Sequence, residues 1–160
     1  MTLNGTLAPG TANSVGKLSV EGNLQLSATS TSIFKVGKFD GSLTNDVVEV
    51  TLGMPSYGGA LDVRLLSGSQ TLAVGDTFTL FSATGSIPGS FSSVTLPAGY
   101  TWNTNTLASG SISVESVVPT IPTTPTNITF AVADGAVTVT WPSDYTGWSL
   151  QVQTNTSSAG

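Results

Sequence analysis

The sequence contains no cysteine and no histidine, and only 8% of its 160 residues are charged. Without cysteine there is no disulfide framework and no thiolate chemistry. Without histidine the commonest general base and the commonest metal ligand are both missing. Together the two absences exclude a Ser-His-Asp triad and argue against zinc, iron–sulfur and blue-copper sites. We therefore expect no catalytic, cofactor-binding or metal-binding residues, and no enzyme activity.

Positive charge is also scarce, and the net charge is −5. The basic residues are Lys17, Lys35, Lys38 and Arg64, and they form no dense patch in the sequence. A nucleic-acid binder needs clustered cations to displace the counterions of phosphates. No run approaches the roughly 20 apolar residues of a membrane-spanning helix. We expect neither a nucleic-acid partner nor membrane insertion.

Serine, threonine, glycine and asparagine fill the space that charged residues leave. Short runs in the first half alternate apolar and polar residues, the period-2 pattern of strands with one buried face. These runs are residues 17–20, 23–26, 32–36, 46–52 and 60–66. Glycines separate them and allow tight turns. The pattern predicts an all-β protein.

A loose repeat of about 20 residues in the first half narrows this prediction. Its copies are residues 3–7, 18–24 and 39–43, each with a glycine between two strand-like ends. A single circuit of this kind cannot bury its inward side chains, but stacked circuits can. We therefore expect a parallel β-solenoid, with a β-meander as the alternative.

Residues 71–115 are richer in aromatic residues and less regular. We expect Phe78, Leu80, Phe91 and Trp102 to form a β-rich cap that seals the open end of the solenoid. An uncapped terminal circuit would expose unpaired strand edges to aggregation.

A change of composition marks a linker after this region. Residues 117–126 hold three prolines at three-residue spacing, which favours extended polyproline II structure. Beyond it, residues 127–132, 136–141 and 148–153 read as three strands, and Asp134-Gly135 as the tight hairpin turn between the first two. We expect three regions: 1–116, the linker 117–126, and 127–160 as a partial β-sandwich.

Four segments in the first 115 residues resemble the autotransporter-associated β-strand repeat of large surface proteins of Verrucomicrobia and Planctomycetes. They are residues 5–10, 16–24, 75–81 and 89–97, and the match is most specific through Trp102 and residues 110–114. Residues 125–155 resemble the start of a fibronectin type III-like domain, whose later strands are missing here. The resemblance implies a right-handed parallel β-helix that is exported, and it supplies no catalytic residues.

These observations predict a non-catalytic structural protein, outside the cell or on the bacterial surface. Its role would be a stalk or passenger segment, or a fibre subunit that self-associates head to tail by strand complementation. The sequence opens without the basic start and apolar run of a signal peptide. We therefore expect it to be a segment of a longer parent chain, or Met1 to have been added.

The alternative function is a carbohydrate-binding or adhesive module that contacts surface glycans. Exposed aromatic side chains would carry it, and the candidates are Trp148, Tyr145 and Tyr100. Trp141 and Trp148 lie in or beside alternating runs, which favours the hydrophobic core for both.

The carboxylates of the chain suggest two further kinds of site. Paired carboxylates could cleave polysaccharides on such a scaffold, but the four candidates read as solvated surface acids: Asp40, Asp46, Glu49 and Asp62. Asp40, Asn45 and Asp46 could offer oxygen ligands to calcium, but their spacing matches no known loop and such residues commonly form turns.

Overall fold

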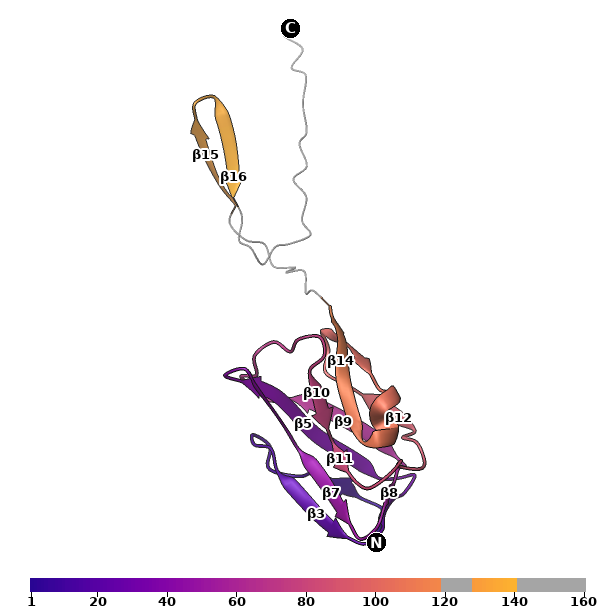
Figure 1. Ribbon diagram of the computed structural model, residues 1–160. Coiled ribbons are helices and arrows are strands. Elements are labelled where there is room, and N and C mark those ends of the chain that lie inside the picture. Colours follow the sequence, from indigo (N-terminus) through magenta and orange to yellow (C-terminus); the bar gives the residue numbers. More distant parts are fainter. Residues whose placement is uncertain (119–127, 141–160) are drawn as a thin grey trace. The chain divides into compact units, whose positions relative to one another are not determined.

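The computed structural model describes residues 1–118 and 128–140. The chain divides into two compact units, Met1–Val118 and Pro119–Gly160. The described residues form β-strands and one short 3-10 helix, η1 (Asn105–Ser109), and contain no α-helix (Figure 1). Among these residues no helix has the length and apolar character needed to cross a bilayer. The predicted all-β class is confirmed.

Three parallel sheets make up most of the first unit, and the chain visits them in a fixed order. Each sheet takes one strand from each successive passage of the chain. The first sheet contains β1 (Thr2–Leu3), β4 (Leu24–Leu26) and β8 (Pro55–Ser56). The second contains β2 (Thr6–Leu7), β5 (Thr31–Phe39), β9 (Ala60–Leu65) and β12 (Ser93–Thr95). The third contains β3 (Lys17–Glu21), β7 (Val47–Thr51) and β11 (Phe81–Ser82).

One passage through the three sheets, here called a circuit, is longer than the predicted repeat. Thr6 pairs with Thr31, and Thr31 with Ala60, so a circuit takes about 25 to 30 residues. The predicted copies at 3–7 and 18–24 fall on two different corners, and residues 39–43 form the turn of an antiparallel hairpin between β5 and β6 (Ser42–Asn45). The 20-residue repeat is therefore wrong, although the strands it connected are real.

The hydrophobic core lies between the three sheets. Alternate residues of each strand point inward, as the period-2 pattern requires. The largest fully buried side chains include Phe34, Phe81 and Leu61. The Phe34 and Phe81 rings lie 5.0 Å apart between the second and third sheets. Ser32 also points inward, and its hydroxyl has no hydrogen-bond partner.

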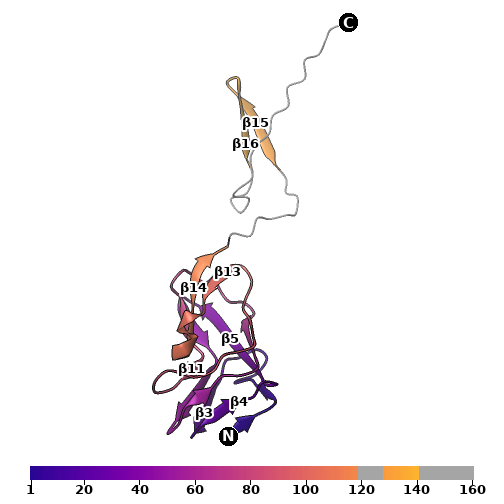
Figure 2. The same cartoon turned by 90° about the vertical axis from the view of Figure 1, so that its right-hand side faces the viewer.

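A three-stranded antiparallel sheet covers one end of this core. It consists of β10 (Thr77–Thr79), β14 (Ser111–Val117) and β13 (Tyr100–Asn103), and we call this sheet the cap. Figure 1 labels β10 and β14, and Figure 2 labels β14 and β13. Phe78 in β10 is fully buried, and its ring lies 6.2 Å from that of Trp102 in β13. The carbonyl oxygen of Gly110 accepts hydrogen bonds from the N–H groups of Leu80 and Phe81 at 2.8 and 3.0 Å. Position 110 accepts only glycine, because the Cβ of any other residue would collide with the carbonyl oxygen of Phe81.

The second unit contributes one described hairpin, β15 (Thr129–Ala133) and β16 (Ala136–Thr140). Asp134 and Gly135 join the strands with φ values of 52° and 76°. Positive φ at both central residues is the mark of a type I′ turn, so the hairpin predicted there is confirmed. The predicted third strand at 148–153, and most of the linker, lie outside the described residues.

Candidate functional site

The aromatic residues proposed for glycan binding fall in different parts of the chain. Tyr145 and Trp148 lie outside the described residues, as does Trp141. Tyr100 is half-buried in β13, and its ring packs edge-on against Trp102 at 5.8 Å. Its hydroxyl oxygen accepts a hydrogen bond from the backbone N–H of Leu72 at 3.2 Å. Tyr100 therefore holds the loop before β10 against the cap.

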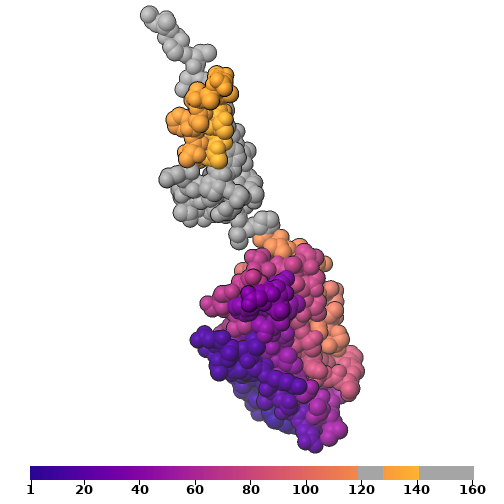
Figure 3. All heavy atoms as spheres, turned by 60° about the vertical axis from the view of Figure 1, so that its left-hand side comes forward, coloured from indigo at the N-terminus to yellow at the C-terminus, as the bar shows by residue number. Residues whose placement is uncertain are grey.

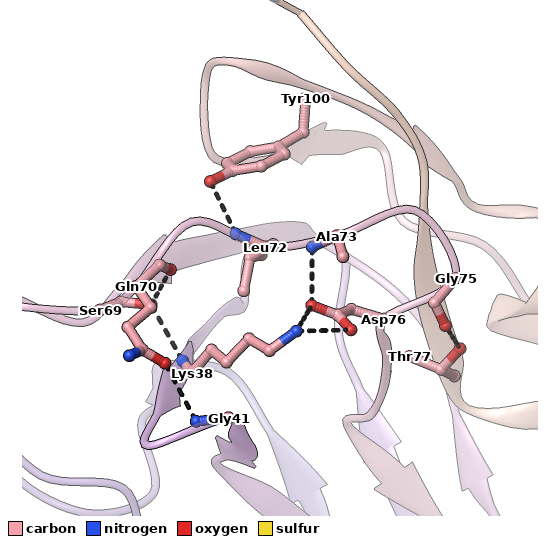
Figure 4. Close-up of polar contacts among 10 residues, drawn as sticks. All are labelled: Lys38, Gly41, Ser69, Gln70, Leu72, Ala73, Gly75, Asp76, Thr77 and Tyr100. Atoms are coloured by element: carbon pink, nitrogen blue, oxygen red, sulfur yellow. Dashed lines mark hydrogen bonds and ion pairs between the residues drawn. The ribbon is translucent and has the colours of Figure 1, made fainter.

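The same loop is fixed by an ion pair that Figure 4 shows in detail. The Lys38 ammonium lies 3.1 Å from the Asp76 carboxylate, and both side chains are largely buried. Asp76 also accepts the N–H of Ala73, and Ser69 accepts the N–H of Lys38. These contacts fasten the β5–β6 hairpin to the segment that leads into the cap. We therefore assign these contacts a structural role.

No local sequence pattern indicates the aromatic cluster that surrounds Tyr57. This ring stacks on Phe91 at 4.5 Å and meets Phe81 edge-on at 5.1 Å. Its hydroxyl donates a hydrogen bond to the carbonyl oxygen of Leu107 at 2.9 Å. Burial raises the pKa of Tyr57 well above its ordinary value. The surrounding Pro-Ser-Tyr-Gly-Gly segment reads locally as a turn, so only the tertiary packing identifies this residue as core.

The four candidate carboxylates do not form a catalytic pair. Glu49 contacts Lys17 at 2.9 Å, and this hydrogen-bonded cation lowers the pKa of Glu49. Asp62 contacts Arg64 at 2.6 Å, and the carboxylate raises the pKa of that guanidinium. Asp40 occupies the β5–β6 turn with a φ of 50°. Each of these three residues has a local role on the surface.

Asp46 contradicts the expectation of a solvated acid, because it is completely buried. Its carboxylate contacts the Lys35 ammonium at 2.6 Å. The side-chain amide of the neighbouring Asn45 donates to the backbone carbonyl oxygens of Asp46 and Thr79. Asp40, Asn45 and Asp46 therefore do not form the predicted group of oxygen ligands for calcium. Within residues 1–118 and 128–140, no three acidic, histidine or cysteine residues group together as a metal site would require.

Unpaired strand edges are the remaining candidate for function. In the described part of the chain, β1, β2 and β3 each have a hydrogen-bonded neighbour on one side only. We call these three strands the N-terminal edge. In Figure 3 the indigo N-terminal segment lies along one side of the first unit, and the pink to orange segment that contains the cap lies along the other.

The longest strand of the N-terminal edge, β3, has a defined hydrogen-bonding direction. The carbonyl oxygen of Gly16 accepts from the N–H of Val47, and the N–H of Gly22 donates to the carbonyl oxygen of Thr51. Because successive backbone groups of a strand point to opposite sides, the even-numbered residues of β3 bond to β7. The N–H and C=O of Ser19 therefore point away from the sheet.

The hairpin of the second unit has one strongly apolar face. Opposite residues in the register are Phe130 with Val139 and Val132 with Val137, so these four side chains share a face. Phe130 is 76% exposed, and Val132 and Val137 are nearly as open. A two-stranded hairpin of this kind is marginal by itself in water. We call these four residues the hairpin apolar face.

Comparison with known proteins adds no relative: no family model, no curated protein and no solved structure matches this chain.

Proposed function

We propose that this chain is a segment of a non-catalytic, extracellular structural protein of a bacterial surface, and that its first unit is a capped β-solenoid. The role is that of a stalk or passenger segment, or of a fibre subunit. Self-association, or contact with further circuits of a longer parent chain, proceeds by addition of strands to the N-terminal edge. The second unit contributes as a partial, fibronectin type III-like sandwich.

The observation that carries this proposal is the repeated order of the three parallel sheets. Each circuit places one strand in every sheet, so a further circuit would meet three free backbone edges at once. Stacking of this kind extends in one direction and does not close, which is how head-to-tail contacts produce filaments. The charge distribution is compatible with it, because β1 and β2 contain no charged residue and the charged residues of β3, Lys17 and Glu21, lie at its two ends.

The hairpin apolar face supports the same proposal from the second unit. Its exposed phenylalanine and valine side chains need a covering layer to be stable in water. Strand complementation by another copy or by the rest of a sandwich would supply that layer. The proposal therefore involves two different surfaces, each of which can be tested by a single substitution.

Ser19→Pro tests the N-terminal edge. Proline removes the N–H that points away from the sheet and blocks an incoming strand, while the bonds from β3 to β7 do not use that group. The matched control is Ser19→Ala, because the serine hydroxyl donates to Glu49 at 3.3 Å and is lost in both variants. We expect concentration-dependent oligomers for the parent and Ser19→Ala in analytical ultracentrifugation, and filaments or rods in negative-stain images. Ser19→Pro should weaken association by about tenfold or more, which corresponds to about 1.4 kcal/mol.

A parent chain that stays monomeric at every concentration, without rods in the images, would contradict the proposal. Equal association of Ser19→Pro and Ser19→Ala, with both folded by circular dichroism, would show that the N-terminal edge is not the contact. Phe130→Lys then separates the surfaces, since it places a charge on the hairpin apolar face and leaves the first unit unchanged.

A further inference from the structure

Lys35 and Asp46 form a buried pair whose geometry goes beyond that of an ordinary ion pair. The Lys35 side chain is 10% exposed and the Asp46 side chain is fully buried. The ammonium nitrogen Nζ lies 2.6 Å from Oδ2 of Asp46 and 2.9 Å from the carbonyl oxygen of Pro9. Lys35 lies in β5, and Asp46 lies between β6 and β7, so the turn of the β5–β6 hairpin separates them along the chain. The backbone therefore fixes both partners.

Two backbone N–H groups also point at the Asp46 carboxylate. Gly16 donates to Oδ1 at 2.7 Å, and Lys35 donates to Oδ2 at 2.8 Å. Donors fixed in this way stabilise negative charge that develops on a carboxyl oxygen during attack at the carbon. The pair thus combines a nucleophilic nitrogen, an electrophilic carboxyl carbon and prepositioned donors in a site with little water.

Burial of the two charges favours a reaction between Lys35 and Asp46. Two charges removed from water carry a large desolvation cost, and condensation of the pair would remove both charges. Neutral amine and carboxylic acid are the forms that can combine. The two protons that the nitrogen must release need to travel only to Oδ2, the oxygen that it already contacts.

We propose that Lys35 and Asp46 condense into an intramolecular amide cross-link. Nζ transfers one proton to Oδ2 and attacks the Asp46 carboxyl carbon, and Oδ1 carries the negative charge beside the Gly16 N–H. A second proton then passes from Nζ to Oδ2, the carbon–oxygen bond breaks and one water molecule leaves. An ammonium and a carboxylate become a neutral amide and water, so atoms and charge balance without any further reagent. Lys35 lines a groove of about 430 Å³, which gives the water a way out.

The contacts in the structure suit the product as well as the reactants. The amide oxygen is the former Oδ1, which keeps its hydrogen bond from Gly16. The Lys35 backbone N–H, which donates to the departing Oδ2, must turn to this amide oxygen, which has a second lone pair to accept it. The one proton left on Nζ points to the carbonyl oxygen of Pro9. All polar groups of the amide then have partners, and two buried charges disappear.

The test is the intact mass of the folded, purified chain, measured after denaturation. We expect the chain to be lighter than its sequence by one water molecule, and a protease digest to contain a branched peptide that joins Lys35 to Asp46. Lys35→Arg should restore the full mass. The matched control is Lys17→Arg, because Lys17 and Glu49 form an exposed pair at 2.9 Å that should not condense. This variant should keep the water loss.

Succinimide formation at Asp40-Gly41 or Asp134-Gly135 also removes one water, and the digest distinguishes it because it leaves no branched peptide. A full sequence mass for the folded parent chain would overturn the proposal, as would a water loss that persists in Lys35→Arg or that maps to either Asp-Gly pair. The inference does not depend on the proposed function, since mass and assembly are measured separately.

Discussion

Leu52 is the position where the structure makes its sharpest quantitative prediction. It connects β7 to β8 with a φ of 55°, and its side chain is 86% exposed. Glu21 pairs with Thr51, so the residue at the same place in the preceding circuit is Gly22, whose φ is 83°. Leucine thus occupies a left-handed conformation that the neighbouring circuit gives to glycine, and it gains almost no burial in return.

The magnitude follows from two opposing terms. A left-handed conformation costs a residue with a Cβ about 1–2 kcal/mol, whereas glycine loses about 0.5–1 kcal/mol more backbone entropy on folding. We therefore expect Leu52→Gly to raise the free energy of unfolding by about 0.5–1 kcal/mol. Gly22→Ala should lower it by a similar amount, because a Cβ there meets no atom within 4 Å, so no steric clash adds to these two terms.

Leu52→Ala is the control, since it removes the exposed side chain but keeps the Cβ, and it should change the stability little. The assay is urea unfolding followed by the fluorescence of Trp102 in the cap, with Trp141 and Trp148 replaced by Phe in every variant. A Leu52→Gly variant that is less stable than Leu52→Ala would refute the reasoning, because it would mean that the backbone at this corner does not favour glycine.

Three other predictions can be checked by the same unfolding assay. Relative to Lys35→Arg, which keeps a cation but cannot form the amide, Lys35→Met leaves the buried Asp46 carboxylate without its partner and should cost about 3–5 kcal/mol, most of which should return when Asp46→Leu is added. Ser32→Ala removes a buried hydroxyl that has no partner, and it should stabilise the fold by about 1 kcal/mol. Tyr57→Phe should cost about 1 kcal/mol, because the carbonyl oxygen of Leu107 loses one of its two donors and keeps only the Gly110 N–H. Burial raises the Tyr57 pKa, so the stability that this residue contributes is complete below the ordinary tyrosine pKa and is lost as the pH rises through its higher folded-state value. Ultraviolet titration of the parent should show a late-ionising tyrosine that is absent from Tyr57→Phe.

Strands were predictable from the sequence because their signal is local. The alternation at residues 46–52 and 60–66 corresponds to β7 and β9 within two residues at each end. The Asp134-Gly135 turn was predictable for the same reason, since a type I′ turn depends only on its two central residues. In each case the pattern and the structure concern the same few neighbouring residues.

The buried pair could not be found in this way. Lys35 lies in an alternating run and Asp46 beside a turn-forming asparagine, and both residue types are usually solvated. Their burial results from the β5–β6 hairpin, which brings the ends of an 11-residue separation together, and from Gly16 and Pro9 in the preceding circuit. A sequence read one segment at a time contains no signal for such a meeting.

The failed repeat has a related cause, and it shows how this fold should be aligned. Vertical neighbours such as Leu7, Ser32 and Leu61 form an inward column, yet the steps between them are unequal. The β5–β6 hairpin lengthens one circuit, and the excursion that contains β10 lengthens the next. A repeat of fixed length therefore aligns the β5–β6 hairpin turn at Asp40 with the turns that connect one parallel sheet to the next. Both kinds of turn contain glycine, so the sequence does not distinguish them. Comparison by strand register instead places Leu52 beside Gly22, and it is this alignment that identifies a strained corner.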